Sequence, residues 1–348
     1  ERDRKDVIHP NDHVNKSQST NDTIPTAMHI STLEAVDEDL LPALKLLHDA
    51  LTEKADEFFP VLKTGRTHLK DAVPIRLGQE FSGYAGTIKG VIGELEHIKT
   101  LLLEIGIGGN AVGTGVNTHP EYSEKMIAQL RKLTGKPWKS ADNRFAFMQN
   151  PSAIFKVSAV LRDLSVHLIK ISSDLRLMDS GPNTGLAEIR LPAVQPGSSI
   201  MPGKVNPVMA EMMYMVASQV IGNDTAIQTA MIGSQLEINV MMPVIAYNIL
   251  QSITILSHAM EVFVHKCVKG ITANEEQCAH WMERSLALTT LLNPLVGYDR
   301  AAQLAYEAQQ SGKAVKQVVL ENGVLTEEEW NKLLIQAVEG TTPKFSHA

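Results

Sequence analysis

The sequence has few of the features that mark disulfide-stabilised, membrane-spanning or nucleic-acid-binding proteins. Its two cysteines, Cys267 and Cys278, cannot make a disulfide framework, which predicts a reducing compartment. No apolar run of about 18 or more residues is free of charge, so no membrane span is expected. The formal net charge is −7 and no basic run is interleaved with aromatic residues. Nucleic acid is therefore not expected as a partner.

The composition favours long packed helices over a sheet-rich fold. Aromatic residues make up only 5% of the chain, whereas hydrophobic residues make up 44% and include 14 methionines. Strands favour aromatic and β-branched residues, and methionine fills irregular gaps in apolar cores. With 348 residues the chain can bury a large core and hold two domains.

Five stretches with helical periodicity dominate the middle of the sequence, and no convincing strand pattern interrupts them. Three of the five are apolar on nearly every face, which predicts that they lie inside a bundle or at the centre of an oligomer. Shorter amphipathic helices are expected after Gly270. We expect the long helices near residues 23–59, 75–105, 151–178, 208–232 and 238–268.

Two patterns hint at bound groups but have the wrong spacing for them. The set His265, Cys267, Cys278 and His280 matches no zinc motif. The glycine-rich stretch Gly106–Gly115 follows a helical pattern and lacks the G-x-G-x-x-G spacing of a dinucleotide loop. The sequence therefore predicts no metal and no cofactor.

The stretch from Gln195 to Pro207 has two glycines, three prolines and no regular period, and a strong helical pattern follows it. A loop that leads into a helix N-terminus offers free N–H groups to an anion. Lys204 adds a charge, Asn206 an amide and Ser198 a hydroxyl. A flexible linker is the alternative. The prolines favour a shaped loop, with Ile200 and Met201 expected to be buried within it.

Two further polar segments lie at the ends of predicted helices, at residues 9–22 and 64–71. The first contains His9, Asn11 and Asp12, which fit a turn or a ligand-contacting loop. It then runs through cap-forming residues that suit a helix start, an anion site or both. The second contains Thr67 and His68, and a loop histidine is often only a hydrogen-bonded surface residue.

Together the three segments supply hydroxyls, amides, histidine and lysine but no obvious set of metal ligands. Such a set suits a small dicarboxylate and acid–base chemistry on it. Antiparallel helices in one subunit would place these segments at opposite ends. Bringing them together is therefore expected to need neighbouring subunits.

The eleven residues Gly197-Ser-Ser-Ile-Met-Pro-Gly-Lys-Val-Asn-Pro207 resemble the signature of the fumarase/aspartase superfamily. The segments His9–Asp22 and Thr64–Asp71 resemble its other two signature regions, in the same order. The resemblance extends over essentially the whole chain and is closest to the class II fumarate hydratases.

The resemblance implies an all-α fold with a long central bundle of five helices. Four copies would form a homotetramer with a twenty-helix core, and each active site would be shared between three subunits. Residues 1–18 would be the remnant of an N-terminal domain and signature loop, 19–270 the central helical bundle domain, and 271–348 a small C-terminal helical domain.

The resemblance also implies catalytic roles for three residues. Ser198 matches the serine that removes a proton from the carbon next to a carboxylate. Serine is a poor base unless its alkoxide is stabilised, which loop N–H groups and nearby Lys204 can do. His68 matches the histidine that positions the water added or lost, and Glu211 matches the carboxylate paired with it.

Binding roles carry over in the same way. Lys204 and Asn206 match the residues that hold the substrate carboxylate, and further polar contacts fall on Ser19, Thr20, Asn21 and Thr67. A second, non-catalytic dicarboxylate site falls on His9, Asn11 and Asp12.

The implied activity is the reversible addition of water to fumarate to give L-malate, without metal or cofactor. The pair Thr67-His68 and Gly203 resemble class II fumarases, whereas Ser19-Thr20-Asn21 and Ile271–Asn274 resemble aspartases. Aspartate ammonia-lyase is therefore the alternative. Argininosuccinate and adenylosuccinate lyases fit worse, because they carry a different residue before the lysine. A non-enzymatic relative, like the lens crystallins of the superfamily, is a third alternative.

Family members have a further N-terminal segment whose Gly-Ser-Gly-Thr loop contributes a threonine to the site. We expect the given chain to be part of a longer protein, and full activity is not expected from it alone. The predicted location is the cytoplasm, or the mitochondrial matrix if the source is eukaryotic.

Overall fold

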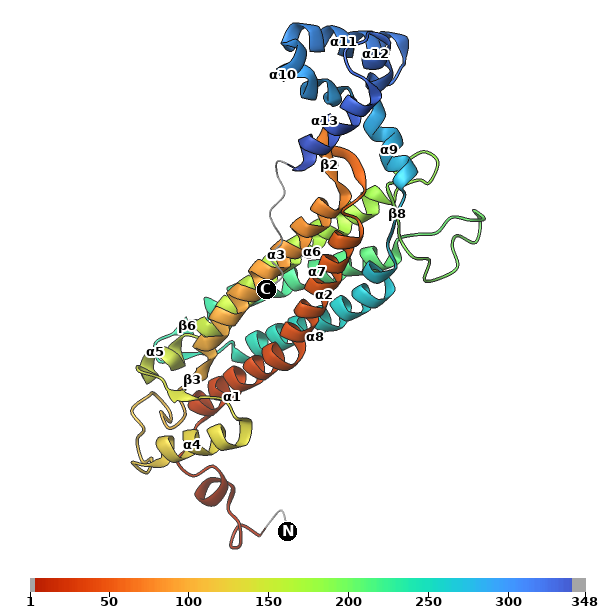
Figure 1. Cartoon of the computed structure of the whole chain (residues 1–348). Helices are drawn as coiled ribbons and strands as arrows, with labels where there is room; N and C mark the ends of the chain where they lie inside the picture. Colours follow the sequence, from red (N-terminus) through yellow and green to blue (C-terminus); the bar gives the residue numbers. More distant parts are fainter. Residues whose placement is uncertain (1–3, 340–348) are drawn as a thin grey trace. The chain divides into compact units, whose positions relative to one another are not determined.

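The computed structural model describes residues 4–339, and α-helices make up most of them, which confirms the all-α class. Figure 1 traces the elements along the chain. The helices are α1 Thr20–Ala35, α2 Leu41–Glu57, α3 Leu77–Ile98, α4 Tyr122–Thr134, α5 Arg144–Gln149, α6 Ser152–Met178, α7 Val208–Met231, α8 Met242–Lys266, α9 Glu275–Arg284, α10 Asn293–Val296, α11 Tyr298–Ser311, α12 Val315–Glu321 and α13 Glu327–Glu339.

The strands of the described residues form two-stranded pairs. They are β1 Leu62–Thr67 with β2 Lys70–Arg76, β3 Glu104–Ile105 with β4 Lys139–Ser140, β5 Ile189–Arg190 with β8 Thr272–Ala273, and β6 Ser234–Gln235 with β7 Ile238–Asn239. The β3–β4 pair is parallel and the others are antiparallel.

The five long helices expected from periodicity are present, with altered ends. The first is divided into α1 and α2 by a π-helical turn at Val36–Leu40. The second begins at Leu77 rather than Ile75, because β2 continues through Arg76. The fifth begins at Met242, after the β6–β7 pair.

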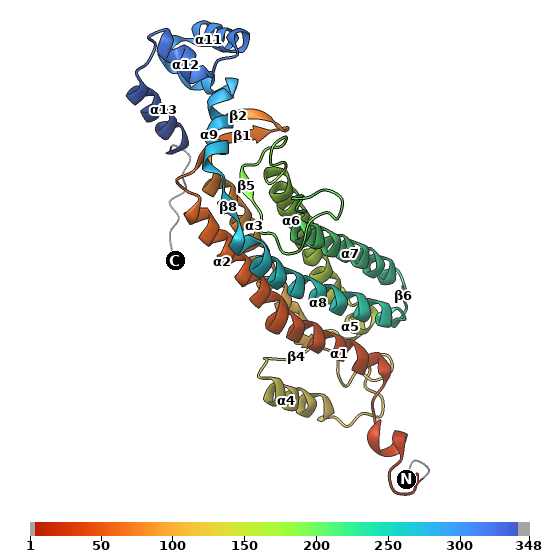
Figure 2. The ribbon, with the colours of Figure 1, turned by 90° about the vertical axis from the view of Figure 1, so that its right-hand side faces the viewer.

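The segment 64–71, which we expected to be a loop between helices, belongs to the hairpin of β1 and β2 (Figure 2). The expectation was wrong because the usual alternation of apolar and polar residues is hidden. Lys63 and Thr64 are both buried in β1, and the charge of Lys63 is balanced by the partly buried Glu80 and the fully buried Glu188. A strand that buries a paired cation does not show a period-2 hydrophobic pattern.

The chain divides into two compact units. Unit 1 comprises Glu1–Leu47, Thr87–Ser172 and Glu211–Val262, and unit 2 comprises His48–Gly86, Ser173–Ala210 and Phe263–Ala348. The unit boundaries fall inside α2, α3, α6, α7 and α8. The three domains expected from the sequence stay a prediction, and their residues 1–3 and 340–348 lie outside the described residues.

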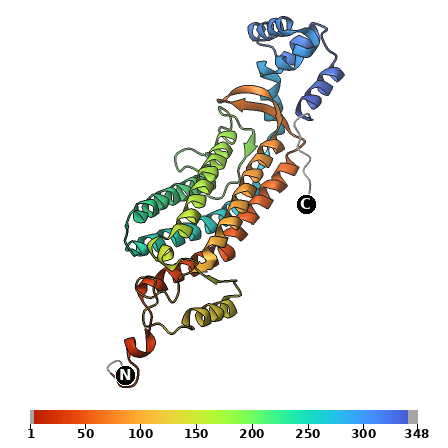
Figure 3. The ribbon, with the colours of Figure 1, turned by 90° about the vertical axis from the view of Figure 1, so that its left-hand side faces the viewer.

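In unit 1, parts of α6, α7 and α8 lie side by side (Figure 3). The Ser158 hydroxyl donates to Asp224 at 2.6 Å, which joins α6 to α7, and Asn223 donates to the Ser252 hydroxyl at 3.0 Å, which joins α7 to α8. Apolar side chains fill the space between the helices, including Leu161, Leu164, Leu168, Val220, Ile227, Ile245, Ile249 and Ile253. Each such side chain contributes about 1.5–3 kcal/mol when fully buried.

In unit 2, the helices after α8 have a hydrophobic core of their own, and its largest side chain is that of Trp330. Its members are Met282, Leu288, Leu292, Ala301, Leu304, Ala308, Val315, Val318, Val319, Trp330 and Leu334, and Leu62 of β1 packs against them. Within residues 4–339, no helix is long and apolar enough to cross a membrane.

Candidate active site

The loop before α7 is folded back on itself rather than extended as a linker. The Ser198 N–H donates to the Lys204 carbonyl at 3.0 Å, and the Lys204 N–H donates to the Met201 carbonyl at 3.1 Å. Gly197 must be glycine, because a Cβ there would lie 1.8 Å from the Lys204 carbonyl oxygen. The expectation that Ile200 and Met201 are buried was wrong, since their side chains are 83% and 47% exposed. Hydrogen bonds and glycine, not apolar burial, give the loop its shape.

Ser198 lies where its oxygen accepts two backbone N–H groups. The N–H of Ile200 donates to Ser198 Oγ at 3.3 Å, and the N–H of Met201 donates to it at 3.2 Å. These distances are long for hydrogen bonds to a neutral hydroxyl and would shorten if the oxygen became charged. Such donors stabilise an alkoxide, which is what a serine base requires.

Lys204 and Asn206 line a cavity of about 790 Å³ in unit 2, next to the same loop. The Lys204 ammonium donates to Asn206 Oδ1 at 2.7 Å. The wall also includes Arg190 of β5, Asn183 and Asn274. Two cations and three amides make this cavity suitable for an anion with several oxygen atoms.

Asp179 is the only carboxylate among the residues that line this cavity. Burial raises the pKa of Asp179, and the backbone N–H of Leu191, which donates to Asp179 Oδ1 at 2.9 Å, opposes that shift.

Thr67 and His68 lie at the tip of the β1–β2 hairpin. Thr67 pairs with Lys70, so the turn consists of His68 and Leu69, with φ of 55° and 58°. Two left-handed residues suit the two-residue hairpin turn, where asparagine and glycine are preferred. Histidine and leucine pay a conformational cost there. His68 and Leu69 are exposed.

Ser19, Thr20 and Asn21 form the start of α1, and their side chains serve the helix and the segment packed on it. Ser19 Oγ accepts the Asn21 N–H at 3.2 Å, and Asp22 Oδ1 accepts the Ser19 N–H at 3.1 Å, which makes a capping box. Asn21 donates to the Ala111 carbonyl at 2.7 Å. The Thr20 hydroxyl donates to Asn21 Oδ1 at 3.3 Å.

His9, Asn11 and Asp12 form a single capped turn. His9 Nδ1 accepts the N–H groups of Asn11 and Asp12 at 3.2 and 3.1 Å, and it lies 3.3 Å from Asp12 Oδ2. His13 Nδ1 accepts the His9 N–H at 2.8 Å, so each of the two histidines is engaged in the turn. Across residues 4–339, no cluster of three or more His, Cys, Asp or Glu has the geometry to hold a metal ion.

The predicted site residues are divided between the two units. Ser198, Lys204, Asn206, Thr67 and His68 belong to unit 2. Glu211, in the first turn of α7, belongs to unit 1, as do the residues from His9 to Asn21. The structure brings Lys204 and Asn206 together beside the Ser198 loop, and Thr67 and His68 are not among the residues that line that cavity.

Sequence reasoning missed Arg190, Asn183, Asn274 and Asp179 of the cavity wall. The segment from Asp179 to Gly185 contains aspartate, serine, glycines, proline and asparagine, and this turn-forming composition was the available signal. Nothing comparable marks Arg190, which lies in a two-residue strand.

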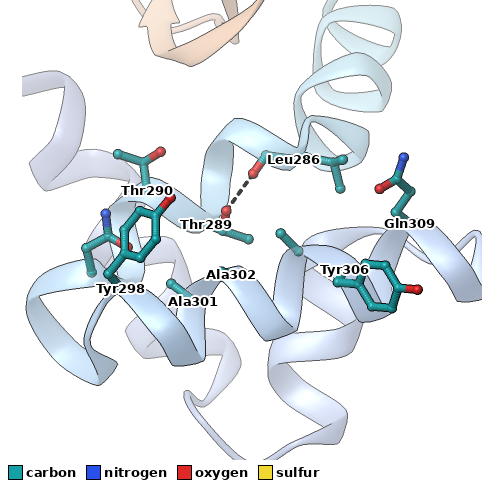
Figure 4. Close-up of a pocket in the computed structure, with 10 residues that line it drawn as sticks. Leu286, Thr289, Thr290, Tyr298, Ala301, Ala302, Tyr306 and Gln309 are labelled. Carbon is teal, nitrogen blue, oxygen red and sulfur yellow. Dashed lines mark hydrogen bonds between the residues drawn. The ribbon is translucent and has the colours of Figure 1, made fainter.

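A second cavity, of about 390 Å³, lies among the helices after α9 (Figure 4). Its wall includes Tyr298, Tyr306 and Thr289, and the Thr289 hydroxyl donates to the Leu286 carbonyl at 2.7 Å. No charged residue lines it. It therefore lacks the cations that a dicarboxylate requires.

Comparison with known families and proteins gives matches over most of the chain. A family model described as Lyase matches residues 3–222, and one described as Fumarase C C-terminus matches residues 288–336. The aspartate ammonia-lyase of Bacillus subtilis is 48% identical over 340 residues, covering 97% of this chain and 71% of the relative. The class II fumarate hydratase of Thermosynechococcus vestitus is 48% identical over 328 residues, covering 94% of this chain and 70% of the relative.

Solved structures of fumarases and fumarate lyases also match most of the chain. A fumarate lyase:delta crystallin from Brucella melitensis bound to cobalt has a TM-score of 0.93 and 44% identity, covering 98% of this chain and 74% of that one. The class II fumarase from Schistosoma mansoni has a TM-score of 0.89 and 37% identity, covering 94% and 72%. The chain belongs to the lyase family that includes the class II fumarate hydratases and the aspartate ammonia-lyases.

Proposed function

We propose that the protein is a fumarate hydratase that interconverts L-malate with fumarate and water. The observation that carries the proposal is the serine loop. Ser198 Oγ accepts two backbone N–H groups beside a cavity lined by Lys204 and Asn206. These groups suit removal of a carbon-bound proton next to a carboxylate that is held by a cation and an amide.

In the proposed dehydration, the Ser198 alkoxide takes the C3 proton of L-malate. The electron pair of that C–H bond moves into the neighbouring carboxylate and forms an aci-carboxylate, whose extra charge Lys204 and Asn206 stabilise. The pair then forms the C2–C3 double bond while the C2 hydroxyl leaves. A proton supplied through His68 converts that hydroxyl to water, with Glu211 as the proposed carboxylate partner of His68. Hydration of fumarate is the reverse sequence.

Aspartate ammonia-lyase is the second candidate, because relatives with each activity are 48% identical to this chain. The two reactions share the proton removal and differ in the leaving group. We favour water because His68, which would handle it, follows Thr67 at the tip of the hairpin. Ser19-Thr20-Asn21 and Ile271–Asn274 are the residues that favour ammonia.

The absorbance of fumarate provides the test. Full-length protein is incubated separately with L-malate and with L-aspartate, and the appearance of fumarate is followed. The proposal expects turnover of L-malate. Turnover of L-aspartate alone would replace it with the second candidate, and turnover of neither would favour a non-enzymatic relative.

We also propose that four copies assemble and share their active sites. Apolar side chains of unit 1 that no part of the described chain covers support assembly, since isolated proteins rarely expose contiguous apolar surface. They include Met215 of α7, Val240, and Tyr247 of α8, each about two-thirds exposed. Light scattering on full-length protein should give four times the chain mass, whereas a monomer would contradict the proposal.

The second dicarboxylate site at His9, Asn11 and Asp12 and the cytoplasmic or mitochondrial location remain part of this proposal. A fumarate hydratase from Danio rerio, 46% identical over 329 residues of this chain, is described as mitochondrial. Weakened binding of a dicarboxylate after His9→Asn, with turnover retained, would support the second site.

A further inference from the structure

Four charged side chains form an ionic cluster at the base of the β1–β2 hairpin. The cluster consists of Lys63 and Arg66 of β1, Glu80 of α3, and Glu188, which directly precedes β5. Lys63 Nζ donates to Glu80 Oε1 at 2.7 Å and lies 3.0 Å from Glu188 Oε2. Arg66 Nη1 donates to Glu188 Oε1 at 2.8 Å. The Glu188 side chain is fully buried and that of Lys63 is 2% exposed.

The hairpin is shaped so that both cations reach one carboxylate. Residues three apart in a regular strand point to opposite faces. Lys63 and Arg66 nevertheless contact the same Glu188, because the β1–β2 register shifts between Thr64 and Arg66. A bulge of this kind re-aims the side chains that follow it. Gly65 permits it, since a Cβ there would lie 2.8 Å from the Val73 carbonyl oxygen.

Glu188 is itself held in place by backbone contacts. Its N–H donates to the Met178 carbonyl at 2.8 Å, and its carbonyl accepts the Asn274 N–H at 2.9 Å. The Asn274 side chain donates to the Ala187 carbonyl and the Trp281 indole donates to the Leu186 carbonyl, each at 2.8 Å. Glu188 is therefore a fixed point to which the hairpin is attached.

Stability alone does not account for this cluster. Removing ions from water costs several kcal/mol per ion, and apolar residues of similar volume often give equal or greater stability. What a buried carboxylate adds, when two cations bind its two oxygens, is a defined orientation of the strand that carries those cations. Arg66 directly precedes Thr67 and His68, so that orientation is passed to them.

We propose that Glu188 is a positioning residue for the reaction. Through Arg66 and Lys63 it fixes the turn that presents Thr67 and His68 to the substrate, without touching the substrate itself. This inference rests on the proposed role of His68.

Glu188→Gln in the full-length protein tests the proposal, because it keeps the shape of the side chain and removes its charge. We expect kcat with L-malate to fall about 100-fold, the loss typical of a misplacement by about 1 Å. KM should change by less than about threefold, because Lys204 and Asn206 still hold the carboxylate.

The rate at which the malate C3 proton exchanges with deuterated water separates positioning from a purely structural role. A purely structural defect would slow exchange and dehydration equally. Ser198 performs that step, so Glu188→Gln should slow dehydration much more than exchange. Glu188→Asp, which retains the charge, should recover part of kcat.

Asp224→Asn is the matched control. Asp224 is a buried carboxylate of unit 1 that binds Ser158, Arg162 and Gln228. Its loss removes a comparable ion pair and should lower the unfolding temperature while kcat stays within about threefold. The two variants are compared in the same assembly state. Equal losses of kcat in Glu188→Gln and Asp224→Asn would overturn the proposal, and so would an unchanged kcat in Glu188→Gln.

Arg66→Ala decides the case if Glu188→Gln fails to fold, because Arg66 is less buried, with 14% of its side chain exposed. It should lose kcat with little change in KM, and retained kcat would overturn the inference. Assays of the unchanged protein with L-malate and L-aspartate separate failure of this inference from failure of the proposed function. Turnover of neither substrate by that protein would overturn the proposed function together with this inference.

Discussion

The start of α1 and the loop before α7 contain similar residues and use them differently. At α1, Ser19 and Asp22 cap the helix, while Asn21 binds the Ala111 carbonyl, so side chains satisfy the protein itself. Before α7, Ser198 Oγ also accepts backbone N–H groups, but there Lys204 and Asn206 of the same loop line a cavity instead of binding the protein's own backbone. Polar residues at a helix start therefore indicate a binding site only where neighbouring side chains line a cavity.

Replacing Ser198 should produce the largest effect. Ser198→Ala removes the proposed base and is expected to lower kcat by about 10²–10⁴-fold with the assembly intact. Ser199→Ala is the matched control, because Ser199 is an exposed serine next to it. Steady-state kinetics with L-malate measure kcat in both variants. Equal losses of kcat in Ser198→Ala and Ser199→Ala would contradict the role of Ser198 as the base.

The free energy of unfolding, measured as a function of pH, should show that buried His29 of α1 contributes to stability. Burial lowers the pKa of His29 of α1 to about 4, and its Nδ1 lies 3.0 Å from the Leu102 carbonyl oxygen. The unfolded chain, with a pKa of about 6.5, binds the proton more readily, so this contribution is complete above pH 6.5 and is lost as the pH falls towards 4.

The loss amounts to about 3 kcal/mol of unfolding free energy. Urea unfolding at pH 7.5, 5.5 and 4.5 measures it. His29→Gln should flatten the dependence between pH 6.5 and 4. An unchanged slope in that variant would assign the pH dependence to other groups.

Arg190 tests whether the cavity is an anion site. Arg190→Met should raise KM for L-malate about tenfold, equivalent to about 1.4 kcal/mol, with a smaller effect on kcat. Arg190→Lys keeps the charge and should recover much of the affinity. Unchanged KM in both variants would show that the cavity wall beyond Lys204 and Asn206 does not contact substrate.

Ser19 should give the smallest effect among these variants. Ser19→Ala removes the cap of α1 and is expected to cost about 1 kcal/mol of stability. Differential scanning calorimetry should detect the lowered unfolding temperature. A large fall in kcat without that shift would instead assign Ser19 to the substrate and weaken the contrast between the two helix starts.

The sequence predicted the parts that local patterns encode. The long helices follow from periodicity, and the shaped loop at 195–207 follows from its glycines and prolines, as the contact between Gly197 and Lys204 bears out. The hairpin of β1 was missed because its inward positions carry Lys63, whose partners Glu80 and Glu188 are distant in sequence. Pairing of buried charges depends on tertiary contacts that no local pattern records.

The cavity residues illustrate the same limit. Arg190 and Asn274 come to line one wall because β5 pairs with β8, with Ile189 opposite Ala273. Each lies in a short segment with weak local preference, so only the fold reveals their proximity. By contrast, Lys204 and Asn206 are two residues apart and were found from sequence alone.

The central claim is that Ser198 and His68 act on one substrate from different copies of the chain. Ser198→Ala and His68→Asn variants, each inactive by itself, are unfolded together, reassembled and assayed with L-malate. Shared sites predict that the mixture regains activity, because some hybrid sites contain both intact residues. A mixture of Ser198→Ala with Lys204→Met should remain inactive, since one loop carries both residues. Failure of the first mixture to regain activity, with hybrid assemblies demonstrated, would contradict the account.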